Sequence, residues 1–200
     1  MRAAYARAGI DASSVQYVEC HATGTPVGDA VEFSSLNQLW AGRAWSPGQC
    51  TLGAVKANVG HLLTGAGAAG LLKVLLSLRH NTLPPVANFQ RASEKIPLAP
   101  SPFRVLTQSQ PWPKRADGEA RRAAVNAFGI GGLNVHLAVA EHVAGTFHPR
   151  PAPKARSGDD GAVAIVGYGS VVPGALDVAS FLALLETGAS AVGTVPAERW

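Results

Sequence analysis

The sequence predicts an α/β fold, in which helices and strands follow one another along the chain. Segments with the helical spacing of apolar residues alternate with short runs typical of strands. Hydrophobic residues make up 47% of the chain, enough to build a packed core. Only 15% of the residues are charged, which is low for a fully solvated surface. We therefore expect faces that another part of a larger protein covers.

The first 85 residues carry most of the helical signal. The segment over 62–80 is apolar nearly all round, which predicts a buried helix, and Pro84 and Pro85 after it cannot continue a helix. In order, the predicted elements are a helix over 1–9 ending at Gly9, a strand over 15–20, a helix over 29–40 with the apolar stripe Val31, Leu36, Leu39 and Trp40, a strand over 51–55 and the helix over 62–80.

Beyond residue 85 the spacing of apolar residues becomes irregular, and further on the composition of the chain changes. Residues 86–121 are rich in proline, and strands are predicted over 123–127 and 133–141, around a glycine turn. Prolines and basic residues over 145–161 are typical of a linker. A buried strand over 162–166 and an amphipathic helix over 178–185, capped near Asp177, follow it. The predicted domains are residues 1–143, a linker over 144–160, and the start of a second domain over 161–200.

Composition disfavours several classes of protein. No apolar run reaches the length of a membrane span, and the first residues lack the pattern of a secretory signal. The two cysteines, Cys20 and Cys50, do not form a disulfide framework. A cytoplasmic location without membrane attachment is therefore expected.

The net charge of +4 is unevenly distributed. Residues 79–156 carry eleven Lys and Arg against four Asp and Glu, a net charge of +7, and the other residues carry −3. A basic face would attract an acidic partner, although a solvated linker surface explains the same charges. Nucleic-acid binding is not expected, because the basic residues lack interleaved aromatic side chains.

A first motif runs from Glu19 to Asp29 and contains His21 in the run His-Ala-Thr-Gly-Thr. A strand leads into this turn-rich loop, so the loop holds the imidazole rigidly and presents the hydroxyls of Thr23 and Thr25 to a substrate. A histidine that only stabilises a tight turn is the structural alternative.

A second motif, from Lys56 to His61, follows a predicted buried strand and opens the predicted buried helix. The positive end of a helix dipole favours a neutral imidazole, which donates one hydrogen bond to a developing oxyanion. Lys56 is expected to enter the same pocket. The structural alternative is a helix-capping histidine beside a surface lysine.

A third motif, from Asn126 to Asn134, has three glycines within four positions. Glycines free the backbone for close approach to a ligand, with exposed N–H groups as an oxyanion hole. A plain hairpin explains the same glycines.

Together, the three motifs closely resemble the ketosynthase family, the thiolase-like condensing enzymes of polyketide and fatty acid synthases. The second half of that family carries His-Gly-Thr-Gly-Thr, then Lys-x-Asn-x-Gly-His, then a Gly-Phe-Gly-Gly-Thr-Asn-like loop. The resemblance covers residues 1 to about 143. This chain departs from the pattern at Ala22, where glycine is usual, at Ile130, where an aromatic residue is frequent, and at Leu133, where threonine is usual.

The resemblance implies a layered α/β/α/β/α fold, of which this chain is mainly the C-terminal half, with a mixed sheet between helices. It also implies decarboxylative Claisen condensation of an acyl thioester with a malonyl-type extender on acyl carrier protein. No cofactor or metal is implied as bound directly, because phosphopantetheine arrives on the carrier protein. The implied partners are that carrier protein, other domains of the same synthase and a second copy in a homodimer.

The family pattern also implies a role for each matching residue. His21 and His61 would polarise the thioester carbonyl and stabilise the enolate, with Lys56 supporting the second histidine. The remaining implied site residues are Thr23 and Thr25 against the pantetheine arm, Phe128 on the gating loop, and Ile130, whose backbone N–H would join the oxyanion hole.

The family's nucleophilic cysteine has no counterpart here. Cys20 precedes His21 on a strand and should face the opposite way, and Cys50 has no base positioned in sequence. The chain alone is therefore expected not to catalyse condensation. Residues 163–200 resemble the start of a second ketosynthase-like domain, and this tandem resembles the ketosynthase and chain-length-factor pair of polyunsaturated fatty acid synthases.

Other functions remain as alternatives. The same fold serves as a non-catalytic chain-length factor or a decarboxylase-type partner. Gly65 to Gly70 fits G-x-G-x-x-G, but these glycines lie within the apolar helix rather than after a strand, so nucleotide binding is disfavoured. The cysteines and histidines lack the spacing of metal ligands.

Overall fold

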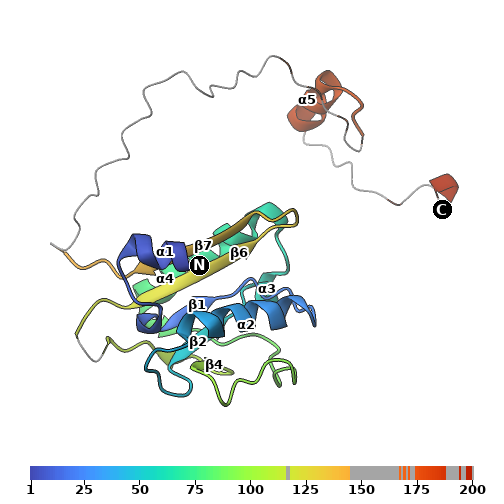
Figure 1. The fold of residues 1–200 in the computed structure, drawn as a ribbon. Coiled ribbons are helices and arrows are strands. Elements are labelled where there is room, and N and C mark those ends of the chain that lie inside the picture. The colour runs from blue at the N-terminus through green and yellow to red at the C-terminus, as the bar shows by residue number, and fades with distance from the viewer. Residues whose placement is uncertain are drawn as a thin grey trace. The chain divides into compact units, whose positions relative to one another are not determined.

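The computed structural model describes residues 1–115, 118–144, 174–187 and 197–199, together with 167, 169, 171 and 194. The chain divides into two compact units, Met1–His148 and Pro149–Trp200. The first unit contains a five-stranded sheet, and the described part of the second contains one helix and a short turn (Figure 1).

The sheet of the first unit has the strand order β4-β2-β1-β6-β7. The strands are β1 (Tyr17–Glu19), β2 (Cys50–Gly53), β4 (Phe103–Val105), β6 (Arg122–Phe128) and β7 (Asn134–Ala140). The first four are parallel, and β7 runs antiparallel to β6, so the sheet is mixed as predicted. A separate antiparallel pair joins β3 (Thr82–Leu83) to β5 (Gln110–Pro111). Loops after β1, β2 and β6 therefore emerge at one edge of the large sheet.

Helices cover the two faces of this sheet. On one face, α1 (Arg2–Ala8) and α2 (Gly28–Trp40) pack around Phe33, Leu36 and Trp40. On the other face, α4 (Ala66–His80) packs through Val74 and Leu78 (Figure 1). The four-residue α3 (Lys56–Val59) connects β2 to the segment before α4. Neighbouring side chains of β1 alternate between the two cores, as a strand requires.

The second unit contains α5 (Val178–Thr187) and a 3-10 turn over Ala197–Arg199. Asp177 Oδ1 accepts the backbone N–H of Ser180 at 2.8 Å, which confirms the cap predicted at this position. The strand predicted over 162–166 lies outside the described residues. Within the described part of the chain, no helix is long and apolar enough to cross a membrane.

The predicted burial of the helix over 62–80 was wrong. The helix begins at Ala66, after a 3-10 turn, and only its sheet-facing side is buried. Leu72, Leu75 and Leu76 on its outer side are about half exposed. The sheet covers one face of α4, and the described residues leave the leucines of the other face uncovered.

Two further differences concern segments whose pattern was misleading. Val31, predicted in the apolar stripe of the helix over 29–40, is exposed, whereas Glu32 is buried. The region predicted as irregular contains β4 and β5. These strands have only three and two residues, which is too short to show an alternating pattern.

The exposed leucines of α4 are expected to make the isolated chain self-associate, because contiguous apolar surface favours association. Replacing Leu72 and Leu76 together by lysine should keep the chain monomeric at concentrations where the parent associates, as measured by sedimentation velocity. Leu78→Ala, on the buried side of the same helix, should instead lower the unfolding free energy by about 2–4 kcal/mol. A monomeric parent chain with a sharp cooperative melt would contradict this prediction.

Candidate functional site

The loop after β1 holds His21 through a buried carboxylate on α2. Glu32 Oε1 accepts the backbone N–H of His21 at 2.8 Å, and Glu32 Oε2 accepts that of Ala22 at 2.9 Å. Ala22 has a φ of 34°, in the left-handed region that costs a non-glycine residue free energy. The bidentate contact therefore holds a strained turn in the conformation that presents the His21 ring.

Glu32 is itself held by side chains of β6 and β7. Asn126 Nδ2 on β6 donates to Glu32 Oε1 at 2.7 Å, and Asn126 Oδ1 lies 2.6 Å from His136 Nδ1 on β7. Because the Asn126 amide nitrogen faces Glu32, its oxygen accepts from His136, whose Nδ1 carries the proton. Burial raises the pKa of Glu32, while the hydrogen bonds from Ala22, Asn126 and His21 oppose that shift.

His61 lies in the segment between α3 and α4. Its Nδ1 accepts the backbone N–H of Leu63 at 3.0 Å. The prediction that His61 opens the long helix was wrong, because α4 begins five residues later, at Ala66. A local backbone contact, rather than the dipole of that helix, orients this ring.

The structure brings the two predicted histidines together. The His21 and His61 rings meet edge to face, with centroids 5.6 Å apart and planes at 83°. Phe128 packs 5.4 Å from the His21 ring, and its backbone N–H donates to His21 Nδ1 at 3.3 Å. Both imidazoles thus use Nδ1 as an acceptor, so in the neutral form each carries its proton on Nε2. The site therefore has an Nε2–H donor on each of two adjacent rings.

Lys56, the first residue of α3, acts on His21 through its charge. Burial lowers the pKa of His21, and the nearby charges of Lys56 and His61 lower it further. Burial also lowers the pKa of Lys56, which the carboxylates of Glu19 and Glu32 oppose. His21 is therefore neutral at pH 7, the state in which Nδ1 accepts the Phe128 N–H.

The two predicted threonines order the loop that follows His21. Their Oγ1 atoms lie 3.3 Å apart, and the Gly28 N–H donates to Thr25 Oγ1 at 3.2 Å. Both side chains are exposed, and Thr25 also lines a largely apolar cavity of about 410 Å³ between α2 and the loop over 86–98. Among the described residues, neither threonine forms a hydrogen bond with His21 or His61.

The glycine turn after β6 places Ile130 at an exposed position. Gly131 and Gly132 have φ values of 101° and 89°, which a side chain would strain. The Gly129 N–H donates to the Leu133 carbonyl at 2.9 Å and closes the turn. Ile130 is fully exposed, and in the described part of the chain it makes no hydrogen bond to either histidine.

Neither cysteine has the surroundings of a nucleophile. Cys20 is 8% exposed and packs in the core on the α2 face, and Cys50 is fully buried. Burial raises the pKa of both thiols above their ordinary value, which disfavours the reactive thiolate. No cluster of three potential metal ligands occurs within the described residues.

The sequence did not point to Glu32 or His136 as parts of the site, and it gave Asn126 no role beyond opening the third motif. One signal was available, since Glu32 stands four positions before Leu36 and therefore on the buried side of its helix. A carboxylate at such a position requires hydrogen-bond donors from the rest of the fold.

His136 is expected to make the stability of the fold depend on pH. Burial lowers its pKa to about 4, so the unfolded chain binds this proton between pH 6.5 and 4 and the folded chain does not. Protonation of His136 in the unfolded chain costs the fold nothing above pH 6.5. As the pH falls from 6.5 to 4, the unfolding free energy should fall by about 2 kcal/mol, after allowance for the partial exposure of the ring.

Urea unfolding at pH 7, 5 and 4 measures this loss. His136→Gln, which keeps a donor toward Asn126, should lose about 2 kcal/mol less than the parent over that range. Glu32 titrates in both proteins with the opposite sign, so the difference isolates His136. Equal losses in the two proteins would contradict the assignment.

Comparison with known proteins identifies the relatives of this chain. Residues 1–90 match the family model described as beta-ketoacyl synthase, C-terminal domain. Polyketide synthase ThaG of Burkholderia thailandensis is 41% identical over 161 residues, and PksN of Bacillus subtilis is 40% identical over 153. These alignments cover 75% and 72% of this chain but only 3% of each relative.

Solved structures agree with the fold described above. The ketosynthase from module 6 of the bacillaene synthase of Bacillus subtilis is 40% identical, with a TM-score of 0.66. The oxazolomycin ketosynthase domain OzmH KS7 of Streptomyces albus is 37% identical, with a TM-score of 0.67. The matches cover 70% and 76% of this chain, and 25% and 27% of those structures. They confirm the predicted thiolase-like α/β fold class.

Proposed function

We propose that the chain contributes the histidine half of a condensing site, because residues 1–90 match the C-terminal domain of beta-ketoacyl synthases and the similar proteins include polyketide synthases and their ketosynthases. The reaction is decarboxylative Claisen condensation of an acyl thioester with a malonyl-type extender on acyl carrier protein. One observation carries the proposal: His21 and His61 meet with both Nδ1 atoms engaged and both Nε2–H groups available.

The two donors suit the charge that this reaction develops. Breaking the bond between the extender's α-carbon and its carboxylate releases carbon dioxide, and the electron pair delocalises onto the thioester oxygen as an enolate. Two N–H donors directed at this oxygen would stabilise it. The enolate carbon then attacks the acyl thioester, and the thiol that carried the acyl group leaves as a thiolate. The positive charge of Lys56 close to His21 adds to the stabilisation.

The other predicted residues take roles that their positions support. Thr23 and Thr25 lie in the exposed loop directly after His21, where the pantetheine arm would arrive. Phe128 packs on the His21 ring, so its movement would gate the histidine pair. The backbone N–H of Ile130, in the turn that follows Phe128, would serve the acyl oxyanion.

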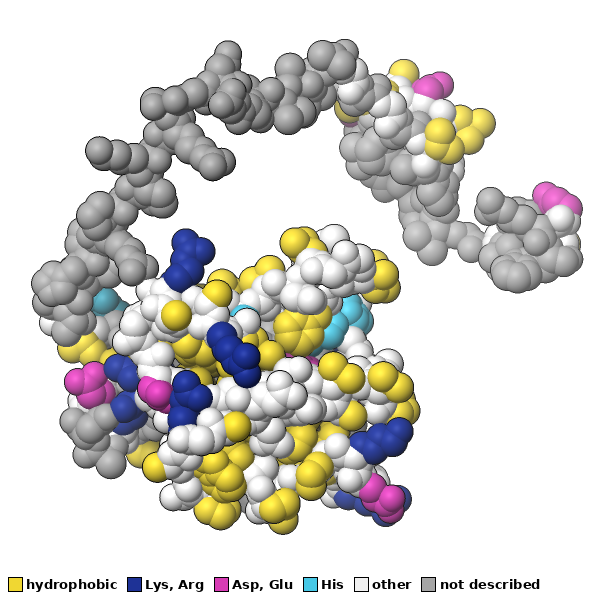
Figure 2. Space-filling model, viewed as in Figure 1, with side chains coloured by type: hydrophobic (Ala, Val, Ile, Leu, Met, Phe, Trp, Pro, Cys, Tyr) yellow, Lys and Arg dark blue, Asp and Glu magenta, His cyan; other side chains and the backbone are white. Residues whose placement is uncertain are grey.

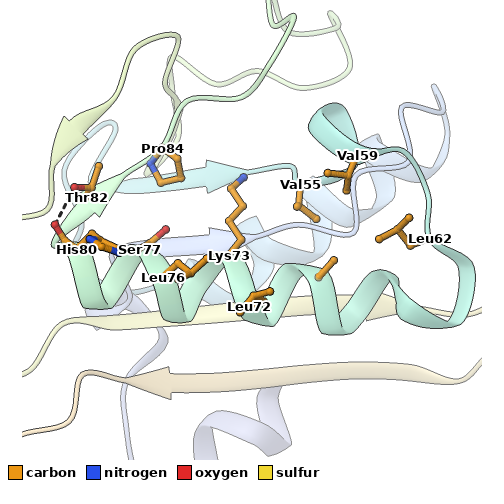
Figure 3. A pocket seen from close by; sticks show the side chains of 11 residues that line it. Val55, Val59, Leu62, Leu72, Lys73, Leu76, Ser77, His80, Thr82 and Pro84 are labelled. Atoms are coloured by element: carbon orange, nitrogen blue, oxygen red, sulfur yellow. Dashed lines mark hydrogen bonds between the residues drawn. The ribbon is translucent and has the colours of Figure 1, made fainter.

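We propose that ketosynthase residues outside this chain supply the nucleophilic cysteine. We also propose that such residues pack against the exposed leucines of α4. The chain spans 3–9% of the curated relatives and about a quarter of the solved ketosynthases. A groove of about 440 Å³ runs along α4, lined mainly by apolar residues such as Val59, Leu72 and Leu76 (Figure 3). The missing part of the ketosynthase would fill this groove.

The chain alone is expected to form no acyl-enzyme. Incubation with an acyl thioester should leave Cys20 and Cys50 unmodified by mass spectrometry, because both thiols are buried and protonated. Acylation of either thiol followed by elongation would contradict the proposed division of the site.

Polyketide assembly is the proposed pathway, since each relative named above is a polyketide synthase. The polyunsaturated fatty acid synthase subclass requires a second thiolase-like domain that begins at about residue 161. Determining the coding sequence beyond Trp200 tests it, since an acyltransferase there would contradict this subclass. By the same resemblance, the proposed partners are acyl carrier protein, neighbouring synthase domains and a second ketosynthase copy.

The decisive experiment uses the ketosynthase completed by its upstream coding sequence. It is supplied with an acyl thioester and malonyl-loaded carrier protein, and both carbon dioxide release and elongated product are measured. A condensing enzyme yields both, and a decarboxylase-type partner yields carbon dioxide alone. Failure to release carbon dioxide by the folded protein would contradict the proposal and favour a chain-length factor.

A further inference from the structure

A second buried carboxylate lies on the opposite face of the sheet from Glu32. Glu19, the last residue of β1, is 1% exposed. Its Oε2 accepts the Tyr17 hydroxyl at 2.7 Å and lies 3.1 Å from Lys73 Nζ of α4. The Lys73 contact is an ion pair that lacks hydrogen-bond alignment. Burying two charges is costly, so the fold must hold this pair in place by other contacts.

Two glycines make room for this carboxylate. A Cβ atom on Gly53, the residue paired with Glu19 in β2, would lie 2.5 Å from Glu19 Oε2 and 2.0 Å from the Tyr17 hydroxyl. A Cβ atom on Gly70 of α4 would lie 3.2 Å from Glu19 Cγ. Neighbouring elements on both sides therefore omit a side chain where Glu19 lies.

The free oxygen of Glu19 reaches the segment that carries the second motif. Glu19 Oε1 accepts the backbone N–H of Val55, the residue immediately before α3. Lys56 begins this helix, and Gly60 then leads to His61. A helix of four residues does not hold itself in place, so α3 depends on contacts with its surroundings. Figure 3 shows Lys73 extending from α4 toward the strand layer, beside Val55.

We propose that Glu19, held by Lys73 and Tyr17, is a positioning residue that fixes residues 55–61 so that Lys56 and His61 lie against His21. Its importance for catalysis rests on the proposed function, but its effect on geometry is measurable without turnover. The competing explanation is an ion pair that only stabilises the core. Such a pair is often replaceable by apolar side chains without loss of stability.

The pKa of His21 distinguishes the two explanations. Apart from burial, the groups that act on it are Lys56 and His61, which lower its pKa, and Asp29, which raises it. Two of these three lie in the segment that Glu19 anchors. If that segment moves away, the pKa of His21 rises toward its ordinary value. A change confined to the core leaves the pKa of His21 unchanged.

The test uses the 200-residue chain with Glu19→Leu and Lys73→Met together, a change that removes no net charge. NMR titration of the His21 imidazole should show its pKa shifted upward. Exchange of the Val55 amide hydrogen should be about tenfold faster, because it loses its acceptor. The matched control is Arg121→Met with Glu141→Leu, another ion pair of low exposure, which should leave both readouts unchanged.

A second variant keeps the test open if the double variant does not fold. Val55→Pro removes the N–H that Glu19 accepts and puts the ring Cδ in its place, and Val55 already has a φ of −61°, which suits proline. An upward shift of the His21 pKa in either folded variant supports positioning. An unchanged pKa in both folded variants, or in Val55→Pro alone if the double variant unfolds, would overturn the inference. A shifted pKa in a ketosynthase that releases no carbon dioxide would support positioning and count against the proposed function.

Discussion

Replacing His61 by alanine is expected to slow decarboxylation by the completed ketosynthase on the order of a hundred- to a thousand-fold, the usual cost of losing one oxyanion donor. His21→Ala should cost as much, because in the proposed site each ring would supply one Nε2–H to the same developing charge. Carbon dioxide release from malonyl-loaded carrier protein measures the rate. The effect should fall on the rate constant more than on KM, since the charge appears only in the transition state.

Two matched substitutions separate this effect from unfolding. His61→Gln keeps an N–H donor on a side chain of similar reach, so its loss should be smaller than that of His61→Ala. His142→Ala changes an exposed histidine outside the site and should leave the rate unchanged. Equal rates in the parent and in folded His61→Ala would remove the central observation of the proposal.

Replacing Glu32 by alanine is expected to lower the unfolding free energy by about 3–5 kcal/mol. The substitution leaves three donors without their acceptor: the backbone N–H groups of His21 and Ala22 and the side-chain amide of Asn126. Each unsatisfied buried donor costs about 1–3 kcal/mol, and the strained Ala22 turn loses its anchor. Equilibrium urea unfolding at pH 7 measures the change.

Glu32→Gln retains one acceptor oxygen and should lose about half as much stability as Glu32→Ala. Glu94→Ala removes an exposed carboxylate and should change stability by less than about 0.5 kcal/mol. If Glu32→Ala lost no more unfolding free energy than Glu94→Ala, the Glu32 carboxylate would not anchor the His21 loop.

Much of the fold was predictable, because β1, β6, β7 and α2 carry strong local patterns. The strand predicted over 123–127 is found as β6, one residue longer at each end. The three-residue β4 was not predictable, since its pairing with β2 joins residues about fifty positions apart. The pattern of α4 indicates apolar contacts on all sides, but the described residues supply contacts on one side only.

The site was predictable only where a motif carries it. His21, His61 and Lys56 stand in runs that are informative by themselves, and the structure places them close enough for their charges to interact. Glu32 and Asn126 are 94 positions apart, so their hydrogen bond is a property of the tertiary fold. Glu19 is the first residue of the first motif, but its contacts with Val55 and Lys73 follow only from the tertiary fold.

The parallel arrangement of β2, β1 and β6 has a practical consequence for protein engineering. It gathers the three motif-bearing loops at one edge of the sheet, and the turn between α2 and β2 lies at the other edge. Residues 44–47 of that turn are exposed, and Gly42 and Gly48 flank them with positive φ. A fluorescent domain or an immobilisation tag inserted there would be separated from the candidate site by the full length of the strands.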